Sequence, residues 1–199
     1  MKGQFRKTLR AKRSAFTARD RTQRSKLAAC AITRLAAFKS GARVAAYLPI
    51  RGETDTAALI AAARRRGIRI YVPVVSDLRH RRLRFYALTD KTRPGVYGIN
   101  VPHASSLGRG RVVAPRWFNL VVAPVVGVDL TGHRLGMGGG FYDRAFAFRR
   151  NRRHWLGPQL VGLAFECQRI DANCGDPWDL KLDAVATETG IRKFREQSP

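Results

Sequence analysis

The stretch FNLVVAPVVGVD at residues 118–129 leads, after a short gap, into RLGMGGGFYDR at residues 134–144. The first stretch is a short apolar run, which predicts a buried β-strand. The second has glycine at four of the five positions 136–140, although glycine loses more conformational freedom on folding than any other residue. Such a cluster is expected where the backbone must adopt a positive φ or come close to a ligand or another segment.

A helix predicted over about 140–150 places this glycine loop between a buried strand and a helix. Backbone N–H groups and the helix dipole make such a loop an anion site, and ligands of open α/β sheets bind beyond the carboxyl ends of strands. The loop is not a Walker A motif, because no Gly-Lys-Ser/Thr follows, and Phe141 excludes G-x-G-x-x-G. The residues alone leave two interpretations open, a phosphate-binding loop and a tight structural turn.

The segments on either side alternate between helix and strand patterns. Residues 3–38 predict two helical segments with apolar residues at Leu27, Cys30, Ala31, Leu35 and Phe38. The other expected elements are a helix over 52–67 that begins at Thr54 or Asp55 and stops at Gly67, strands over 44–50, 68–75, 82–89, 159–165 and 183–187, and a long loop over 90–116. This order predicts a single α/β domain over residues 1–199, a three-layer sandwich with a largely parallel central sheet and an N-terminal helical segment.

The charge of the chain is unusual, with 38 lysines and arginines against 14 acidic residues and a net charge of +24. Such a field attracts nucleic acid, and also phosphorylated or polyglutamylated small molecules. The alternative is an arginine-rich bias spread over a solvated surface. RNA-binding strands with interleaved aromatics and zinc-finger spacing are absent, which disfavours a dedicated nucleic-acid role.

The cysteines and histidines show no metal-ligand spacing, so no zinc site is expected. They are Cys30, Cys167, Cys174, His80, His103, His133 and His154. No apolar run has the length of a membrane span, and the basic N-terminus lacks the apolar block of a signal peptide. We therefore expect a cytoplasmic protein with reduced thiols.

Five segments of the chain resemble the 5-formyltetrahydrofolate cyclo-ligase family, also called 5,10-methenyltetrahydrofolate synthetases. The loop at 134–144 matches the family's R-L-G-x-G-x-G-[FY]-Y-D-[RK] pattern. KGQFR at 2–6 resembles its K-x-x-L-R element, with Phe5 in place of leucine, and YLPIRGETDT at 47–56 resembles Y-x-P-x-x-x-E-x-x-T. VGLAFECQ at 161–168 and DLKLDAVATE at 179–188 resemble its last two strands.

The resemblance implies an enzyme that uses MgATP to close 5-formyltetrahydrofolate into 5,10-methenyltetrahydrofolate, with release of ADP and phosphate. In the family's scheme the formyl oxygen attacks the γ-phosphate of ATP, N10 of the folate attacks the activated carbon, and phosphate leaves. Such a reaction depends on positioning and charge stabilisation. The sequence accordingly shows no Ser-His-Asp grouping and no setting for a reactive cysteine.

The resemblance also implies roles for individual residues. The ATP-binding residues are Lys2, Arg6, Arg134, Gly136, Gly138, Gly139, Gly140 and Tyr142, of which Arg134 and Tyr142 are the catalytic pair. The folate-binding residues are Leu48, Glu53, Met137, Gly138, Gly139, Gly140 and Phe141. The ligands of Mg²⁺ are Asp143 and Asp183, because magnesium takes one or two carboxylates together with phosphate oxygens and waters.

Each role has a structural alternative. Lys2 and Arg6 lie one helical turn apart, so they face the same phosphates or belong to a solvated basic helix. Leu48 fits the core, and the charge of Glu53 fits the start of a helix. Of the two aromatic residues after the glycines, we expect one to stack on a ring and the other to anchor the loop.

For the two aspartates the alternatives are structural contacts. Asp143 could pair with Arg144 or complement the start of a helix, and Asp183 could cap the end of a strand. Two positions depart from the family pattern. Met137 stands where many relatives have tyrosine or arginine, and Val101 takes the acidic place of the G-[IV]-x-E-P turn in GVYGINVP at 95–102.

Two rival functions remain at this stage. One is a non-catalytic nucleic-acid-binding protein, and the other is a nucleotide- or folate-binding protein without turnover. The expected partners are ATP and 5-formyltetrahydrofolate, including polyglutamylated forms, with no membrane or nucleic acid, and a monomer is favoured.

Overall fold

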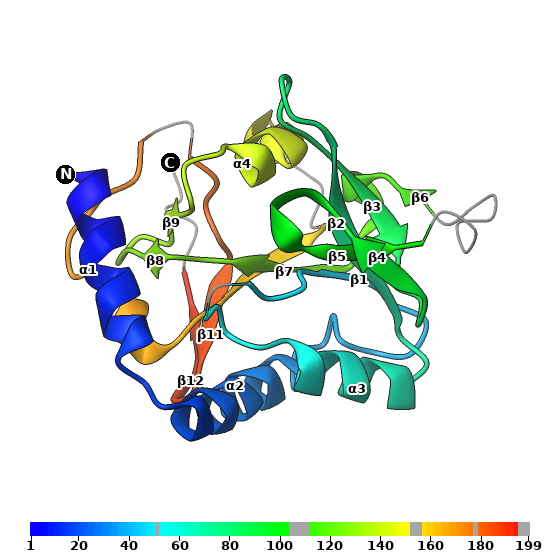
Figure 1. Cartoon of the computed structure of the whole chain (residues 1–199), viewed down its shortest axis with the longest axis horizontal. Coiled ribbons are helices and arrows are strands. Elements are labelled where there is room, and N and C mark those ends of the chain that lie inside the picture. The colour runs from blue at the N-terminus through cyan, green and yellow to red at the C-terminus, as the bar shows by residue number, and fades with distance from the viewer. Residues whose placement is uncertain (51, 104–111, 152–156, 177–178, 195–199) are drawn as a thin grey trace.

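A mixed, mostly parallel sheet forms the centre of the protein (Figure 1). The computed structural model describes residues 1–199 except 51, 104–111, 152–156, 177–178 and 195–199. Within the described residues the strand order is β12-β11-β10-β7-β1-β2-β3-β6. Pairing is parallel from β11 to β2 and antiparallel at the outer strands. The strands are β1 (Arg43–Ala46), β2 (Arg69–Asp77), β3 (Arg82–Ala87), β6 (Val112–Val113), β7 (Leu120–Pro124), β10 (Gln159–Leu163), β11 (Ala184–Thr187) and β12 (Gly190–Lys193).

Helices cover both faces of this sheet (Figure 1). Helices α2 (Ala18–Ile32) and α3 (Ala57–Arg65) lie along one face, and α4 (Phe141–Ala145) lies on the other. Helix α1 (Lys2–Ser14) lies at one end, beside β8 (Gly127–Val128). None of the described helices is long and apolar enough to cross a bilayer. The arrangement confirms the predicted α/β fold with an N-terminal helical segment.

The central strands are buried on both sides, which explains their continuous apolar sequences. Along β1, Val44 and Ala46 pack in the core that contains α2 and α3, whereas Ala45 packs in the core that contains α4. The same alternation divides β7, where Leu120 and Val122 face the first core. The carboxyl ends of these strands therefore meet at one well-fixed edge.

The N-terminal region confirms two helices, and the expected buried positions are right in part: Ala31 and Phe38 are buried and Leu35 packs against the core. Leu27 is 47% exposed and Cys30 is exposed, while Ala28, Ala29 and Ile32 are buried. Helix α2 begins after Thr17, whose Oγ1 accepts a hydrogen bond from the Asp20 N–H. The small alanines pack close to the sheet, so the larger Leu27 remains outside.

Several helices and strands are shorter than the sequence predicted. The strand expected over 44–50 ends at Ala46, and the carbonyl of Tyr47 accepts a hydrogen bond from the Thr56 hydroxyl instead. Helix α3 begins after Thr56 rather than at Thr54 or Asp55. The helix expected over 140–150 is α4 followed by the 3₁₀ helix η4 (Ala147–Asn151).

The loop expected over 90–116 is wrong in part, because it contains a separate two-stranded ribbon. Strands β4 (Thr92–Pro94) and β5 (Asn100–Pro102) pair antiparallel around the 3₁₀ helix η1 (Val96–Gly98). Val101 is buried in this ribbon, and a Cβ at Gly95 would lie 2.7 Å from its Cγ1. That packing explains an apolar residue at the position where the family pattern has an acid. Residues 104–111 of the expected loop lie outside the described part.

The remaining elements were not anticipated by the sequence. They are the ribbon of β8 with β9 (Arg134–Leu135), the edge strand β12, and the 3₁₀ helices η3 (Pro115–Trp117) and η5 (Glu166–Gln168).

The central position of β7 makes its side chains sensitive to truncation. Leu120 is fully buried, so we expect Leu120→Ala to lower the free energy of unfolding by about 2–5 kcal/mol. Leu78→Ala is the control, because Leu78 is 54% exposed and its truncation should change stability by less than about 0.5 kcal/mol. Urea denaturation followed by circular dichroism measures both. Equal losses in the two variants would contradict the assigned core.

Candidate active site

A cavity of about 830 Å³ opens at the carboxyl ends of the parallel strands. Pro124 at the end of β7, Pro73 and Val75 of β2, and the residues that follow β1 form its base. The glycine loop, the start of α1 and the β4–β5 ribbon form its sides. Ligands of open α/β folds bind in this position, and every sequence-predicted site residue except Asp183 lies in the lining.

The glycine loop reaches the cavity with an unusual backbone. Gly138 has φ of 98° and Gly140 has φ of 66°, values that residues with a Cβ rarely adopt. The Nε of Arg6 donates a 2.8 Å hydrogen bond to the carbonyl of Gly136 and so fixes α1 against the loop. Since α4 spans only five residues, its dipole is smaller than the sequence suggested. Any attraction for an anion must come mainly from the loop and nearby cations.

Arg134 connects both ends of this loop. Its guanidinium Nη2 lies 3.3 Å from each carboxylate oxygen of Asp143, and its Nη1 lies 3.4 Å from the carbonyl of Pro124. Its Cζ also lies 5.2 Å from the centroid of the Tyr142 ring. The side chain is only 7% exposed, and its Nε has no hydrogen-bond partner among the described residues. The ion pair of Asp143 is therefore with Arg134, not with Arg144.

The two aromatic residues after the glycines differ in burial, and one of them anchors the loop as expected. Tyr142 is buried and stacks on Phe146, with ring centroids 6.1 Å apart, so it anchors the loop in the core. Burial raises the pKa of the Tyr142 hydroxyl, and the charge of Arg134 only partly opposes this. Phe141 is half-buried and lines the cavity. Both rings line the cavity, and that of Phe141 is the more exposed of the two.

Lys2 and Arg6 both line the cavity from the first turn of α1. The ammonium of Lys2 lies 2.5 Å from a carboxylate oxygen of Asp176 and 2.5 Å from one of Asp179. Burial lowers the pKa of Lys2, but the hydrogen bonds and charges of these two aspartates outweigh it and raise the pKa. Asp176 and Asp179 line the cavity too. The sequence analysis missed both, although two acids within DPWDL are conspicuous in so basic a chain.

Glu53 and Leu48 also line the cavity. The Glu53 carboxylate accepts a 3.1 Å hydrogen bond from the Ile50 N–H. Burial raises the pKa of the Glu53 carboxyl, and this hydrogen bond and the charge of Arg13 offset the rise only in part. Leu48 lines the cavity and also packs against the core, so the core interpretation is confirmed and folate binding by this residue stays a prediction.

Asp183 lies away from the described lining of the cavity. Its Oδ2 accepts a 2.6 Å hydrogen bond from the Leu160 N–H, and its Oδ1 accepts one of 2.7 Å from Arg149. These contacts match the alternative of a cap at the end of a strand. The Asp143 carboxylate instead accepts a hydrogen bond from the N–H of Leu180, the residue after Asp179. In the described residues, no group of three or more His, Cys, Asp or Glu side chains could hold a metal ion.

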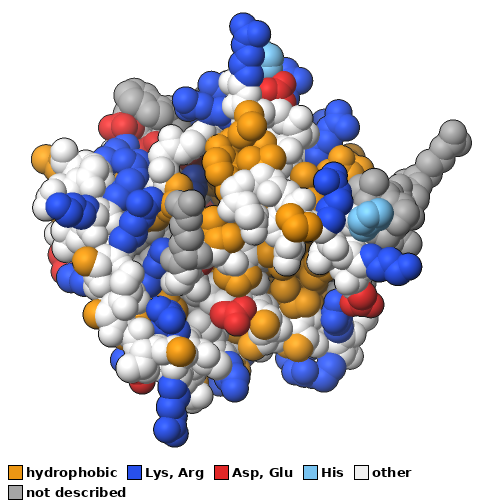
Figure 2. Space-filling model, viewed as in Figure 1, with side chains coloured by type: hydrophobic (Ala, Val, Ile, Leu, Met, Phe, Trp, Pro, Cys, Tyr) orange, Lys and Arg blue, Asp and Glu red, His pale blue; other side chains and the backbone are white. Residues whose placement is uncertain are grey.

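The lining contains the expected Met137 and several residues that were not expected. Met137 is 45% exposed, and its sulfur lies 2.9 Å from a guanidinium nitrogen of Arg10. Tyr97 and Ile99 reach the cavity from the β4–β5 ribbon, which the sequence did not predict. On the face drawn in Figure 2, basic side chains are scattered widely and acidic ones are few.

Comparisons with known proteins agree with this arrangement. The model of the 5-formyltetrahydrofolate cyclo-ligase family matches residues 1–188. The 5-formyltetrahydrofolate cyclo-ligase of Escherichia coli strain K12 is 30% identical over 183 residues, which cover 92% of this chain and 98% of that protein. The 5-formyltetrahydrofolate cyclo-ligase of Haemophilus influenzae is 28% identical, and the match covers 90% of this chain and 93% of that protein.

Solved structures show the same likeness. The NMR structure of Aquifex aeolicus 5,10-methenyltetrahydrofolate synthetase superposes with a TM-score of 0.80 at 27% identity, over 100% of this chain and 95% of that chain. The structure of the Mycoplasma pneumoniae 5,10-methenyltetrahydrofolate synthetase shares the fold, with a TM-score of 0.71 at 22% identity. The match covers 94% of this chain and 98% of that chain. Family model, relatives and fold together place this chain in the 5-formyltetrahydrofolate cyclo-ligase family.

Proposed function

We propose that the cavity is the active site of an ATP- and Mg²⁺-dependent enzyme that closes 5-formyltetrahydrofolate into 5,10-methenyltetrahydrofolate and releases ADP and phosphate. One observation carries this proposal: Glu53 and the glycine loop line the same cavity. A folate ring and a nucleotide phosphate bound at these two places would meet inside it. Membership of the cyclo-ligase family supports the same reaction.

The two sides of the cavity suit the two substrates. Leu48 and Ile50 offer an apolar surface for a planar ring, and the Glu53 carboxylate can accept hydrogen bonds from ring N–H groups. On the other side, Lys2, Arg6 and the glycine loop offer cations and backbone N–H groups to phosphates. Lys2 would then share its ammonium between the phosphates and its two aspartates.

The residues act by holding charge and geometry rather than by covalent chemistry. Phosphoryl transfer to the formyl oxygen needs the two reacting groups in line and in contact. Arg134 lies beside the loop, where its guanidinium can stabilise the negative charge on the transferring phosphoryl group. Phe141 would pack on the folate, while Tyr142 holds the loop and Arg134 in place.

Asp143 and Asp179 are the carboxylates that fit a magnesium ion at this site. Both line the cavity, and hard oxygen donors of this kind, completed by phosphate oxygens and waters, are those that Mg²⁺ prefers. Bound there, Mg²⁺ would neutralise phosphate charge. Asp183 is left out of this set because it lies outside the described lining of the cavity.

We further propose that residues 1–199 act as one catalytic domain, as a monomer in the cytoplasm. The central sheet supports the single domain, since its strands come from both halves of the chain.

The two candidate metal aspartates can be separated by experiment. We expect Asp179→Asn to raise the Mg²⁺ concentration for half-maximal activity and to lower kcat by about a hundredfold, because a catalytic metal contributes several kcal/mol. Asp143→Asn should do the same and also disturb Arg134. The absorbance of the methenyl product measures turnover, with EDTA removing the metal.

Asp183→Asn is the matched control. It should leave the Mg²⁺ dependence unchanged but lower the free energy of unfolding by about 1–3 kcal/mol, because Arg149 loses its partner. Asp176→Asn breaks the other ion pair of Lys2 and so separates that effect from metal binding. A Mg²⁺ dependence that shifts in Asp183→Asn and not in Asp179→Asn would contradict the proposed ligands.

The pH dependence of folate binding should report on Glu53. Burial raises the pKa of this carboxyl, and only the ionised form accepts hydrogen bonds on both oxygens. We therefore expect kcat/KM for the folate to rise with pH through a range above that of an ordinary glutamate. Glu53→Gln should remove this rise and lower kcat/KM about 30-fold, the effect of one hydrogen bond to a charged group.

Asp55→Asn is the control for this profile, because Asp55 is exposed and bonds only the start of α3 in the described structure. It should keep the full pH profile. If kcat/KM of Glu53→Gln still rises with pH as in the wild type, a group other than Glu53 is responsible for the pH dependence.

A further inference from the structure

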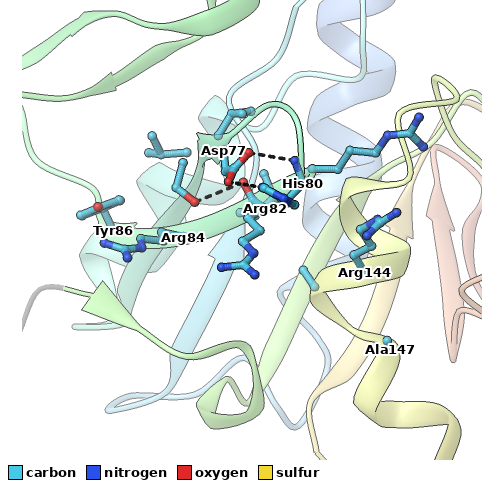
Figure 3. A pocket seen from close by; sticks show the side chains of 13 residues that line it. Asp77, His80, Arg82, Arg84, Tyr86, Arg144 and Ala147 are labelled. Atoms are coloured by element: carbon cyan, nitrogen blue, oxygen red, sulfur yellow. Dashed lines mark hydrogen bonds and ion pairs between the residues drawn. The ribbon is translucent and has the colours of Figure 1, made fainter.

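Glu53, the carboxylate proposed to bind the folate ring, has few hydrogen bonds of its own. Within the described residues it accepts one, of 3.1 Å from the Ile50 N–H. Asp77, in a second cavity of about 850 Å³ along the β2–β3 hairpin, gives a contrast. Its carboxylate accepts 2.8 Å and 2.7 Å hydrogen bonds from the backbone N–H and the ring Nδ1 of His80 (Figure 3). These bonds hold the pKa of Asp77 below its usual range, whereas burial raises the pKa of Glu53. Glu53 therefore depends on a further partner to stay ionised.

Arg13 lies next to the loop that carries Glu53. It belongs to the last turn of α1, where the helix dipole favours a cation, and it is only 5% exposed. Its Nε lies 4.0 Å from a Cβ built on Gly52, the residue before Glu53. Arg13 is not part of the described cavity lining, although Glu53 is. The guanidinium thus reaches this loop without lining the cavity.

The charges of Arg13 and Glu53 stabilise each other. Burial lowers the pKa of Arg13, and among the neighbouring charges that of Glu53 opposes this fall most. In the described structure Arg13 is in turn the charged side chain that lowers the pKa of Glu53. An arginine stays protonated when it is buried, and a buried charge without an opposite charge nearby is strongly destabilising. Each of the two residues therefore needs the other.

The other groups that face this loop do not supply that charge. Burial raises the pKa of the Tyr47 and Tyr142 hydroxyls, so both are neutral, and Tyr47 donates its proton to the Thr54 carbonyl at 2.6 Å. The Nη1 of Arg21, from α2, lies 3.9 Å from the same Cβ on Gly52. Its charge is nevertheless not among those that change the pKa of Glu53.

The cations that line the cavity act elsewhere. Lys2 pairs with Asp176 and Asp179, and Arg134 pairs with Asp143. Within the described residues, none of the lining cations is among the charges that change the pKa of Glu53. Arg13 is left as the cation that serves this carboxylate.

We propose that Arg13 is a positioning residue, whose guanidinium keeps the Glu53 carboxylate ionised and available in the cavity for the N–H groups of the substrate ring. The inference rests on the proposed function, in which Glu53 binds the folate. Arg13 touches no substrate and acts through Glu53 alone. Helix α1 then serves both substrates, because its first turn carries Lys2 and Arg6 to the phosphates and its last turn carries Arg13 to Glu53.

Direct titration of Glu53 in the protein without substrate tests this inference. The chain has only four glutamates, at 53, 166, 188 and 196, so labelling their side-chain carboxyls with ¹³C gives few NMR signals, and Glu53→Gln identifies the signal of Glu53. In Arg13→Gln we expect Glu53 to titrate about one pH unit higher than in the wild type, because a nearby opposite charge is lost. Arg13→Lys keeps the charge and should recover most of this difference.

Lys12→Gln is the matched control. It removes the same charge from the neighbouring position of α1, and Lys12 is exposed and outside the described cavity lining. The titration of Glu53 should be unchanged in this variant. An equal change in Lys12→Gln and Arg13→Gln would point to the general positive field of the protein and would overturn the proposal. An unchanged titration in Arg13→Gln would overturn it as well.

The wild type offers a second measurement, which does not require Arg13→Gln to fold. The ¹⁵Nε signal of Arg13, identified by its loss in Arg13→Lys, should move over the pH range in which Glu53 titrates. This movement should disappear in Glu53→Gln. A signal of Arg13 that does not respond to the titration of Glu53 would contradict the proposed coupling.

Equilibrium dialysis with 5-formyltetrahydrofolate separates this inference from the proposed function. Below the pH at which Glu53 titrates, Arg13→Gln should weaken binding about tenfold, because a pKa one unit higher lowers the ionised fraction tenfold. In the Glu53→Gln background the same substitution should cause no further loss. An equal further loss there would mean that Arg13 acts independently of Glu53, which overturns the positioning role. If Glu53→Gln alone binds the folate as the wild type does, the proposed folate-binding role of Glu53 is wrong, while the NMR titrations still decide whether Arg13 controls its charge.

Discussion

The buried guanidinium of Arg134 joins the end of the central strand β7 to the start of α4, and the glycine loop spans the distance between them. A buried charge costs several kcal/mol unless it is paired. The charge of Arg134 is stabilised by the Asp143 carboxylate, the Pro124 carbonyl and the Tyr142 ring. Because these contacts hold both ends of the loop, the glycines can keep positive φ values and still line the cavity.

A second set of contacts holds the N-terminal helix at the site. Lys2, near the beginning of the chain, lies between Asp176 and Asp179, near its end. Helix α1 also packs Leu9 against the apolar cluster that contains Ile170. The site therefore exists only when distant parts of the chain have come together. No local segment could assemble it alone.

The sequence was informative where local pattern and tertiary environment agree. The apolar run of β7, buried on both faces, and the glycine loop after it were both recognisable. The position of Asp179 in the cavity lining was not, because residues 179–183 follow no regular helix or strand, and periodicity cannot say which of Asp179 and Asp183 faces the cavity. The prediction of the buried side of α2 was wrong in part for a related reason. Small residues lie on two faces of this alanine-rich helix, so the pattern did not define which face is buried. In the β4–β5 ribbon, glycines and prolines indicated a loop, and the strand pairing depends on contacts such as Val101 with Gly95.

The separation of this ribbon from the main sheet has an evolutionary consequence. It supplies Tyr97 and Ile99 to the cavity, yet it pairs with no strand of the eight-stranded sheet in the described structure. A two-stranded ribbon contributes little stability of its own, so substitutions there change the shape of the cavity at small cost to folding. Drift and selection can thus reshape the cavity through the ribbon, while the parallel strands at the base of the cavity stay constrained.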